Sequence, residues 1–322
     1  MKAIVCREIN DDIGALKLED IELAPLGPQQ ARIRIRAAAV NFPDILTAQG
    51  KYQHKPQLPY TPGSEAAGDV IAFGSDVTGV KVGDRVICGG NGSYAEEMQI
   101  AAAALRRIPD GVGYAEAASF TVAYLTAYVS HVRRTQLQAG EWLLVHGAAG
   151  GVGLAAVDLG KVLGAKVIAT ASTETKRAFL KGYGADHVLP STGFRDAVKE
   201  ITGGEGANVI YDPVGGDVFD ESTRCVAFDG RIAIIGFTSG RIPTVSVNMP
   251  LIKGYSIMGV RAGEYGRKFP QKGRENMFAI MKLLAEKKIR PHIHERFPLA
   301  RALDAMRTLQ DRSVIGKVVI EP

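Results

Sequence analysis

Residues 1 to about 120 carry short apolar runs with the period of β-strands. In residues 31–40, ARIRIRAAAV, apolar and charged residues alternate with a period of two, which is typical of a strand with one buried face. Shorter apolar runs follow at 66–74 and 84–90, and glycine, proline and aspartate residues separate them. This part of the chain is therefore predicted to be rich in β-strands.

From residue 141 the pattern changes to buried strands that alternate with helices. The strands are continuous runs rich in valine and isoleucine, which is typical of a parallel sheet covered on both faces. The strands are expected at 141–147, 166–171, 186–189, 207–214 and 230–237, and the helices at 151–164, 173–184, 194–201 and 217–228.

After this series a further helix is expected at 275–288 and a closing strand at 316–322. The fold class is thus α/β, with a β-rich domain, a doubly wound parallel sheet inserted into it, and a C-terminal return to the first domain. The expected limits are 1–123 for the first part, 124–260 for the parallel-sheet domain and 261–322 for the return. A chain of 322 residues is long enough for two domains, each with its own core.

Composition and charge exclude several classes of protein. The 39 lysine and arginine residues stand against 34 aspartate and glutamate residues, and both signs are scattered, which is typical of a solvated surface and not of a nucleic-acid-binding stripe. No run approaches the roughly 18 apolar residues of a membrane-spanning helix, and the first ten residues fit a strand better than a signal peptide. Cys6, Cys88 and Cys225 lie far apart, which argues against a disulfide framework and a cysteine zinc site. We expect a cytoplasmic protein that binds neither nucleic acid nor membrane.

The stretch 145–160, VHGAAGGVGLAAVDLG, has the pattern of a dinucleotide-binding turn. It directly follows a buried strand and opens a helix, which is the setting that the motif requires. Gly150, Gly151 and Gly153 lack side chains where N–H groups must approach a pyrophosphate and where the helix must pack on the strand. Ala148 replaces the first glycine, and alanine fits there if φ stays negative. The sequence predicts a nucleotide site, with a tight turn that binds no ligand as the alternative.

The residues after the second strand of this series indicate which nicotinamide cofactor binds. NAD-binding proteins place an acidic residue there to hold the ribose hydroxyls, whereas this chain has Ala171 and Ser172. Glu174 follows, but it fits the first turn of the next helix better. Lys176 and Arg177 are cations that would attract a 2′-phosphate, so NADPH is favoured over NADH. The alternative is that both merely decorate an exposed helix.

Several further segments resemble the medium-chain dehydrogenase/reductase superfamily. They are NFPDILTAQGKYQHKPQLPYTPGSEAAGDV at 41–70, GDRV at 83–86, LTAY at 125–128, YDPVGG at 211–216 and GKVVI at 316–320. With the glycine turn they are most similar to the quinone oxidoreductase, or zeta-crystallin-like, branch, and the resemblance covers essentially the whole chain. It implies a GroES-like catalytic domain, a Rossmann cofactor domain and NADPH-dependent reduction without a metal.

The resemblance also bears on metals. Zinc-dependent relatives carry a cysteine ligand where this chain has Val40 and Asn41, and a His-Glu pair where it has Ser64 and Glu65. Without cysteine or histidine ligands there is no catalytic zinc, and the four-cysteine structural zinc lobe has no counterpart either. His146, beside the glycine turn, is expected to be a packed core histidine.

The resemblance assigns roles to individual residues. Asn41 is expected at the cleft near the nicotinamide amide, Thr126 at the nicotinamide end, and Lys317 approaching the cofactor from the last strand. Lys176 matches the residue that binds the 2′-phosphate, although Leu-Pro at 189–190 replaces an Asn-Tyr pair that many members carry near this phosphate. The expected cofactor-binding residues are Asn41, Thr126, Ala149, Gly150, Gly151, Val152, Gly153, Ser172, Lys176, Gly236, Phe237, Ser239 and Lys317.

The expected chemistry is hydride transfer to a quinone or to the β carbon of an enone, in which donors must stabilise the oxyanion that forms. Asn41 and Tyr52 are the candidate catalytic residues. Tyr52 lies in a loop that the family folds over the site, and it is a candidate proton donor. An aromatic ring that only packs this loop is the alternative.

Three functions are consistent with these residues. The first is an NADPH:quinone reductase, and the second is an NADPH-dependent reductase of α,β-unsaturated carbonyls or enoyl thioesters. The third is a structural or RNA-binding protein that keeps NADPH affinity but has little turnover. The substrate pocket is expected in loops 47–60 and 261–275, and the basic residues of the second loop would suit either an anionic substrate or solvent. The family further implies a homodimer, joined through the strand at 255–260.

Overall fold

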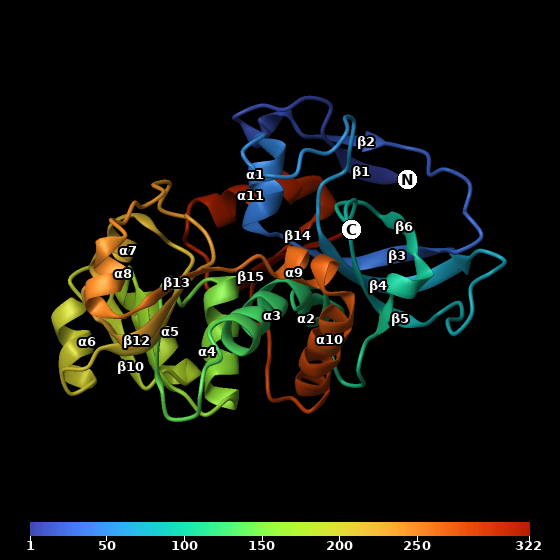
Figure 1. The fold of residues 1–322 in the computed structure, drawn as a ribbon. Helices are drawn as coiled ribbons and strands as arrows, with labels where there is room; N and C mark the ends of the chain where they lie inside the picture. The colour runs from blue at the N-terminus through green and yellow to red at the C-terminus, as the bar shows by residue number, and fades with distance from the viewer. The chain divides into compact units, whose positions relative to one another are not determined.

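The computed structural model describes all 322 residues and divides them into two compact units. The first unit comprises Met1–Val122 and Pro291–Pro322, and the second comprises Ala123–Arg290. Each unit has its own sheet (Figure 1). The contacts group residues 261–290 with the second unit, whereas the sequence pattern predicts them in the return to the first domain. The expected limits of the functional domains stay a prediction, because compactness alone does not define them.

A seven-stranded sheet forms the framework of the first unit. Its order is β14-β15-β3-β4-β5-β7 with β6 also paired to β3, and all neighbours are antiparallel except β14 and β15. Alternate residues of β3 are buried, as the period-two pattern predicts. The strands are β3 (Gln30–Ala39), β4 (Glu65–Phe73), β5 (Arg85–Gly89), β6 (Glu97–Ala101), β7 (Arg106–Arg107), β14 (Ile293–Pro298) and β15 (Lys317–Glu321), and β1 (Lys2–Val5) pairs separately with β2 (Lys17–Asp20).

The core of the first unit lies between this sheet and two helices, α1 (Phe42–Ala48) and α11 (Ala302–Gln310). Ile45 of α1 and Met306 of α11 are buried in the same apolar cluster as Ile33 of β3. Burial of such side chains is the main force that holds the unit together. The remaining helices of this unit are short, namely η1 (Ile13–Ala15), η2 (Ala102–Ala104), α2 (Tyr114–Ala118) and η4 (Leu299–Arg301).

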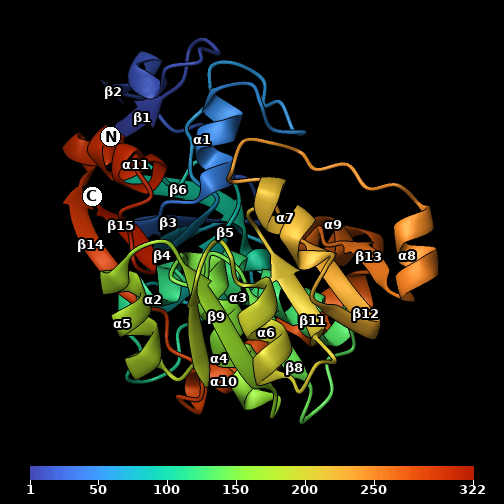
Figure 2. The same cartoon turned by 90° about the vertical axis from the view of Figure 1, so that its left-hand side faces the viewer.

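A six-stranded parallel sheet forms the second unit, in the order β10-β9-β8-β11-β12-β13. The strand order reverses between β8 and β11, and helices cover both faces (Figure 2), which confirms the predicted doubly wound sheet. The strands are β8 (Trp142–Val145), β9 (Lys166–Ala171), β10 (His187–Pro190), β11 (Ala207–Asp212), β12 (Val226–Ile234) and β13 (Ser256–Gly259). The helices are α3 (Thr121–Tyr128), which starts at the unit boundary, the π-helix η3 (Val129–Arg134), α4 (Gly151–Val162), α5 (Glu174–Tyr183), α6 (Arg195–Ile201), α7 (Gly216–Ser222), α8 (Asn248–Lys253), α9 (Ala262–Lys268) and α10 (Pro270–Ala285). None of the helices in the structure has both the length and the apolar character that crossing a membrane requires.

One helix is shorter than its pattern predicts. The sequence favours a single helix over 217–228, but α7 ends at Ser222 and β12 begins at Val226. The reason is strand pairing, because Val226 pairs with Ala207 of β11. A β-branched residue beside a partner strand favours the extended conformation, so tertiary pairing overrides the helical periodicity.

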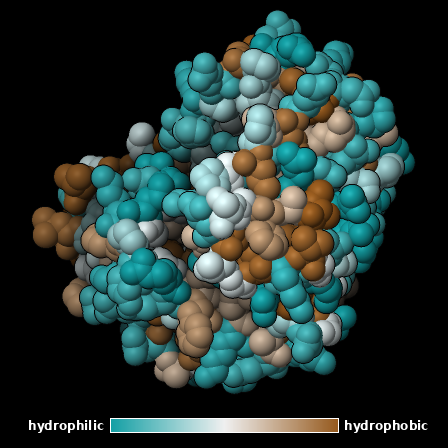
Figure 3. Space-filling model, turned by 90° about the vertical axis from the view of Figure 1, so that its right-hand side faces the viewer, coloured by the Kyte–Doolittle hydropathy of each residue, from teal (hydrophilic) through white to brown (hydrophobic).

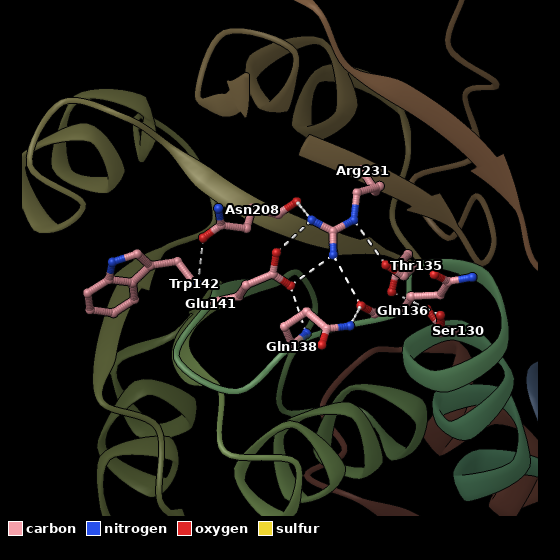
Figure 4. A network of polar contacts seen from close by, with 8 residues as sticks. All are labelled: Ser130, Thr135, Gln136, Gln138, Glu141, Trp142, Asn208 and Arg231. Carbon is pink, nitrogen blue, oxygen red and sulfur yellow. Dashed lines mark hydrogen bonds and ion pairs between the residues drawn. The ribbon is translucent and has the colours of Figure 1, made fainter. Parts of the chain in front are cut away.

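A polar network joins Arg231 of β12 to the amino-terminal ends of β8 and β11 (Figure 4). Arg231 of β12 donates from both terminal guanidinium nitrogens to the two carboxylate oxygens of Glu141, each at 2.8 Å, and its Nε donates to the Thr135 carbonyl at 2.9 Å. The Asn208 side-chain oxygen accepts from the Trp142 N–H at 2.8 Å. The Arg231 and Glu141 side chains are only 16% and 19% exposed, so this bidentate pair is stronger than an ordinary surface pair.

One half-buried carboxylate, that of Asp158, accepts hydrogen bonds from residues near both ends of the second unit. Asp158 of α4 accepts hydrogen bonds from the hydroxyls of Tyr124 at 2.5 Å and Tyr183 at 2.9 Å, and from the N–H of Arg290 at 3.5 Å. Burial raises the pKa of Asp158, and these donors oppose that shift. Tyr124 is the second residue of this unit and Arg290 is its last.

Candidate functional site

The glycine turn lies at the carboxyl end of β8, before α4. Its positive φ, 54°, falls on Gly147, and Ala148 is not in the left-handed region, so alanine fits there as the sequence predicts. A Cβ on Gly153 would lie 2.7 Å from Ala148 Cα and closer still to the Gly147 carbonyl oxygen. Gly153 therefore allows α4 to pack closely on the turn, whereas a Cβ on Gly150 would meet nothing nearer than 3.4 Å.

The start of α4 has the features of an anion site. The helix begins at Gly151 with Gly150 as its N-cap, and no side chain caps this end. The first N–H groups of a helix have no partner within the helix, and together with the helix dipole they favour an anionic ligand. The predicted residues 149–153 span this end of α4.

His146 anchors the strand end from which the turn departs. Its Nε2 lies 2.8 Å from Ser222 Oγ, and its Nδ1 lies 3.0 Å from Thr170 Oγ1. Because the Ser222 hydroxyl donates to the Val218 carbonyl at 2.7 Å, it accepts from Nε2–H, and Nδ1 accepts from Thr170. The ring is fully buried against Phe194, and burial lowers the pKa of His146 to about 3. His146 is thus the packed core histidine that the sequence predicts.

We expect His146 to make the protein sensitive to acid. Its pKa is about 3 in the folded protein and about 6.5 in an unfolded chain, so the unfolded state binds the proton more readily and stability is lost as the pH falls from 6.5 towards 3. At pH 5 this group should lower the free energy of unfolding by about 2 kcal/mol relative to pH 7. Urea unfolding of the wild type and His146→Gln at both pH values isolates this effect, because the other titrating groups are common to both proteins. An equal loss in the two proteins would contradict the expectation.

The carboxyl end of β9 carries the residues proposed to distinguish the two cofactors. β9 ends at Ala171, and α5 starts at Glu174, so Glu174 lies in the first turn of the helix as predicted. Arg177 turns back over the strand end, where one terminal nitrogen donates to the carbonyls of Ala171 and Ser172, both at 3.2 Å. Burial lowers the pKa of Lys176, which is half-buried beside Arg177.

The loop after β12 completes this edge of the sheet. The backbone N–H of Ser239 donates to the Val214 carbonyl at 2.9 Å, which holds the loop against the residues that follow β11. Gly236, Phe237 and Ser239 therefore lie at the same carboxyl edge as the glycine turn and the end of β9, since all these strands are parallel. Thr126 lies half-buried in α3.

A buried cluster of polar side chains lies in the first unit, and we call Asn41, Glu65 and Lys317 the Lys317 cluster. Lys317 Nζ donates to Asn41 Oδ1 at 2.6 Å and to Glu65 Oε1 at 3.0 Å, and Asn41 Nδ2 donates to Glu65 Oε1 at 2.9 Å. An ammonium group only donates and a carboxylate only accepts, so the amide oxygen of Asn41 must face Lys317 and its nitrogen must face Glu65. The other carboxylate oxygen of Glu65 accepts from the N–H of Val122 at 2.9 Å.

These contacts limit what Asn41 and Lys317 can offer to a ligand. The Asn41 amide nitrogen also lies 3.4 Å from Ser64 Oγ, so both of its hydrogens have acceptors. The Lys317 side chain is 7% exposed and has two acceptors. Their expected contacts with the cofactor stay a prediction. Tyr52 is half-buried in the loop after α1, and its N–H donates to the Leu46 carbonyl at 3.2 Å.

Asp44 and Tyr94 extend the cluster, and the sequence did not indicate either of them as a site residue. Asp44 of α1 accepts from the Asn41 N–H at 2.9 Å and from the Tyr94 hydroxyl at 2.8 Å. Burial raises the pKa of Asp44 to about 6, although these two donors favour its charged form. A signal for Asp44 was present, because Asn41 followed three residues later by Asp44 forms a capping box at the start of α1. No local pattern links Tyr94 to it.

The residues around the cluster do not fit a catalytic zinc ion. Val40, Asn41 and Ser64 bring no thiolate or imidazole, and the Glu65 carboxylate is already bound to an ammonium group. No group of three or more histidine, cysteine, aspartate or glutamate side chains in the structure could hold a metal ion. We therefore derive no catalytic step through zinc.

Two sequence families match the chain. The family described as alcohol dehydrogenase GroES-like domain matches residues 27–125, and the family described as zinc-binding dehydrogenase matches residues 151–284. A quinone oxidoreductase-like protein 2 homolog of Nematostella vectensis is 39% identical over 326 residues, which cover 99% of this chain and 88% of that protein. A quinone oxidoreductase of Pseudomonas aeruginosa is 35% identical over 95% of both chains.

Solved structures of similar fold differ in specificity. Escherichia coli quinone oxidoreductase complexed with NADPH is 29% identical, with a TM-score of 0.91 and full coverage of both chains. An NAD-dependent alcohol dehydrogenase is 30% identical over the full length of both chains, with a TM-score of 0.92. The CurK enoyl reductase is 25% identical over 99% of both chains, with a TM-score of 0.89. Proteins of this fold therefore use different cofactors and acceptors. Individual residues, and not the fold alone, determine which cofactor and which acceptor a protein uses.

Proposed function

Because this chain belongs to the quinone oxidoreductase branch of the medium-chain dehydrogenase/reductase superfamily, it is an oxidoreductase, and we propose that it transfers a hydride from NADPH to a quinone without a metal. The observation that carries the proposal is the carboxyl edge of the parallel sheet. There the uncapped start of α4 lies at the end of β8, and two cations, Lys176 and Arg177, lie at the end of β9. Such an edge suits a dinucleotide that carries an additional phosphate.

The residues of this edge fit the cofactor. The N–H groups at the start of α4 would bind the pyrophosphate, and Ser172 and Lys176 would bind the 2′-phosphate. Gly236, Phe237 and Ser239 would line the same edge. Bound there, NADPH supplies a hydride from its nicotinamide ring. By resemblance, Thr126, Asn41 and Lys317 remain the proposed contacts of the nicotinamide end.

The chain itself must supply a donor to the oxygen of the acceptor, because reduction of a carbonyl leaves an oxyanion there. Asn41 and Tyr52 are the candidates. The amide hydrogens of Asn41 already have acceptors in Glu65 and Ser64. We therefore assign the donor role to the Tyr52 hydroxyl and a positioning role, within the Lys317 cluster, to Asn41.

The acceptor is proposed from the names of the relatives, and enoyl reductases of the same fold supply the alternative. The test mixes the protein with NADPH and a matched panel of simple quinones and α,β-unsaturated carbonyls, and follows the loss of nicotinamide absorbance. Faster oxidation with quinones supports the proposal, and faster oxidation with enones favours the enoyl reductase. No oxidation despite tight NADPH binding would favour a binding protein with little turnover.

Lys176→Ala should weaken NADPH binding about tenfold and leave NADH binding nearly unchanged, because it removes a charge-assisted contact with the 2′-phosphate. Titration calorimetry with both cofactors measures the two affinities. Lys166→Ala is the matched control, because it removes the same charge from the opposite end of β9. If Lys176→Ala weakens both cofactors equally, the 2′-phosphate does not lie beside Lys176.

We propose that the protein forms a homodimer. β13 is an edge strand of the parallel sheet. Before it, Val247 at the N-cap of α8 and Leu251 and Ile252 within α8 are 86%, 82% and 71% exposed. Figure 3 shows apolar side chains projecting from one edge of the molecule. An unpaired strand with exposed apolar neighbours is typical of an interface. Light scattering should give twice the mass of the chain for the wild type and the monomer mass for Leu251→Glu combined with Ile252→Glu, whereas a monomeric wild type would refute the dimer.

A further inference from the structure

An ion pair lies in the first turn of α5, beside the site that we propose for the 2′-phosphate. The Arg177 guanidinium donates to the Glu174 carboxylate at 2.7 Å, and this contact lowers the pKa of Glu174. The other terminal nitrogen of Arg177 donates to the carbonyls of Ala171 and Ser172. Arg177 is thereby fixed at the end of β9, where an NAD-specific protein of this fold holds its acidic residue.

The two partners of this pair differ in solvent exposure and in their other hydrogen bonds. The Arg177 side chain is 21% exposed and is bonded to the backbone of the strand end, whereas the Glu174 side chain is 76% exposed. An ion pair with so exposed a partner is weak. A phosphate group carries more negative charge than a carboxylate and also binds a guanidinium in bidentate geometry. A 2′-phosphate can therefore displace Glu174 while Arg177 stays in place.

We propose that Arg177 is a second ligand of the 2′-phosphate and that Glu174 is a competing counter-ion that reduces the preference for NADPH over NADH. Without a 2′-phosphate, the Glu174 carboxylate neutralises Arg177. When the phosphate binds, Glu174 must leave the guanidinium, and its charge then repels the phosphate. The inference rests on the proposed function, because it assumes that NADPH binds at this edge.

The test uses the adenosine half of the cofactor, so that it does not depend on turnover. Titration calorimetry on the full-length protein compares adenosine 2′,5′-bisphosphate with adenosine 5′-monophosphate, which differ only in the 2′-phosphate. Arg177→Met should weaken binding of the bisphosphate about tenfold and change that of the monophosphate by less than about twofold. Glu174→Gln should strengthen binding of the bisphosphate about threefold and leave the monophosphate unchanged. Lys166→Ala, at the opposite end of β9, should change neither.

The two variants distinguish a contact between Arg177 and the 2′-phosphate from a role of Arg177 in holding the loop after β9. Equal weakening of both probes by Arg177→Met would mean that Arg177 only holds the loop, and an unchanged ratio in Glu174→Gln would mean that Glu174 does not compete. Glu174→Gln leaves the bonds from Arg177 to the two carbonyls intact, so it tests the idea even if Arg177→Met loosens the loop.

Lys176→Ala distinguishes this inference from the proposed function. If Lys176→Ala and Arg177→Met both keep the full preference for the bisphosphate, the 2′-phosphate does not bind at this edge, and both the proposed function and this inference are wrong. If Lys176→Ala loses the preference while Arg177→Met keeps it, only the role of Arg177 is wrong. Failure of the wild type to prefer the bisphosphate would overturn both.

Discussion

Lys317→Met is expected to lower the free energy of unfolding by about 3–5 kcal/mol. The substitution leaves the Glu65 carboxylate and the Asn41 amide oxygen buried without the ammonium group that donates to both. A buried charge that loses its partner costs far more than the pair contributes, because the desolvation of the remaining carboxylate is no longer compensated. Urea unfolding of the wild type and the variant measures the difference.

A double variant tests whether the uncompensated charge is the cause. Glu65→Gln removes that charge, while its side-chain oxygen can still accept from the Val122 N–H. Lys317→Met with Glu65→Gln should therefore be more stable than Lys317→Met alone by at least about 1 kcal/mol. Lys2→Met, which breaks an exposed pair with Asp20, is the control and should stay within about 0.5 kcal/mol of the wild type. A double variant less stable than the single one would contradict the coupling.

Gly153→Ala is expected to destabilise the second unit by about 1–3 kcal/mol and to weaken NADPH binding by at least about tenfold. The added Cβ would overlap the backbone of Gly147 and Ala148, which cannot turn aside as a flexible side chain can. α4 would be pushed away from the turn, and its first N–H groups would move with it. Unfolding in urea and titration with NADPH measure the two effects, and wild-type values in both would show that the close packing is not needed.

Gly150→Ala is the matched control, because it separates packing from ligand binding. At Gly150, φ is −78°, and a Cβ would meet no atom nearer than 3.4 Å. The entropy lost by the unfolded chain and the poorer N-cap oppose each other, so the variant should stay within about 1 kcal/mol of the wild type. If the pyrophosphate lies against this turn, the added methyl group should still weaken NADPH binding. If Gly150→Ala binds NADPH with wild-type affinity, the pyrophosphate does not lie against this turn.

Much of the second unit could be predicted because its strands and helices follow from short, contiguous stretches of sequence. Each strand of the parallel sheet is a short apolar run, and each helix that covers it lies next to its strand in the sequence. The strand β8, the glycine turn and the start of α4 form one uninterrupted segment, so their relation follows from the order of the residues. Local patterns fail at the end of α7. The residues after Ser222 have a helical periodicity, but Val226 pairs with Ala207 of β11 and starts a strand.

The Lys317 cluster could not be predicted in this way. Lys317 and Asn41 are 276 residues apart, and only the pairing of β15 with β3 brings them together. A lysine at the start of a strand is ordinarily expected at the surface, with its charged end in water. The resemblance implies a cofactor contact for Asn41 and another for Lys317, and it implies no contact between the two. The structure adds that they bind each other.

The carboxylate of Asp158 has a consequence for the way this protein could have been assembled. Tyr124 and Arg290, at the two ends of the second unit, both bond to it, so the ends of this segment meet at one point. A segment whose ends meet can be spliced into a loop of a host chain, or removed from it, without stretching either partner. Residues 123–290 therefore have the geometry of a domain inserted into a host chain.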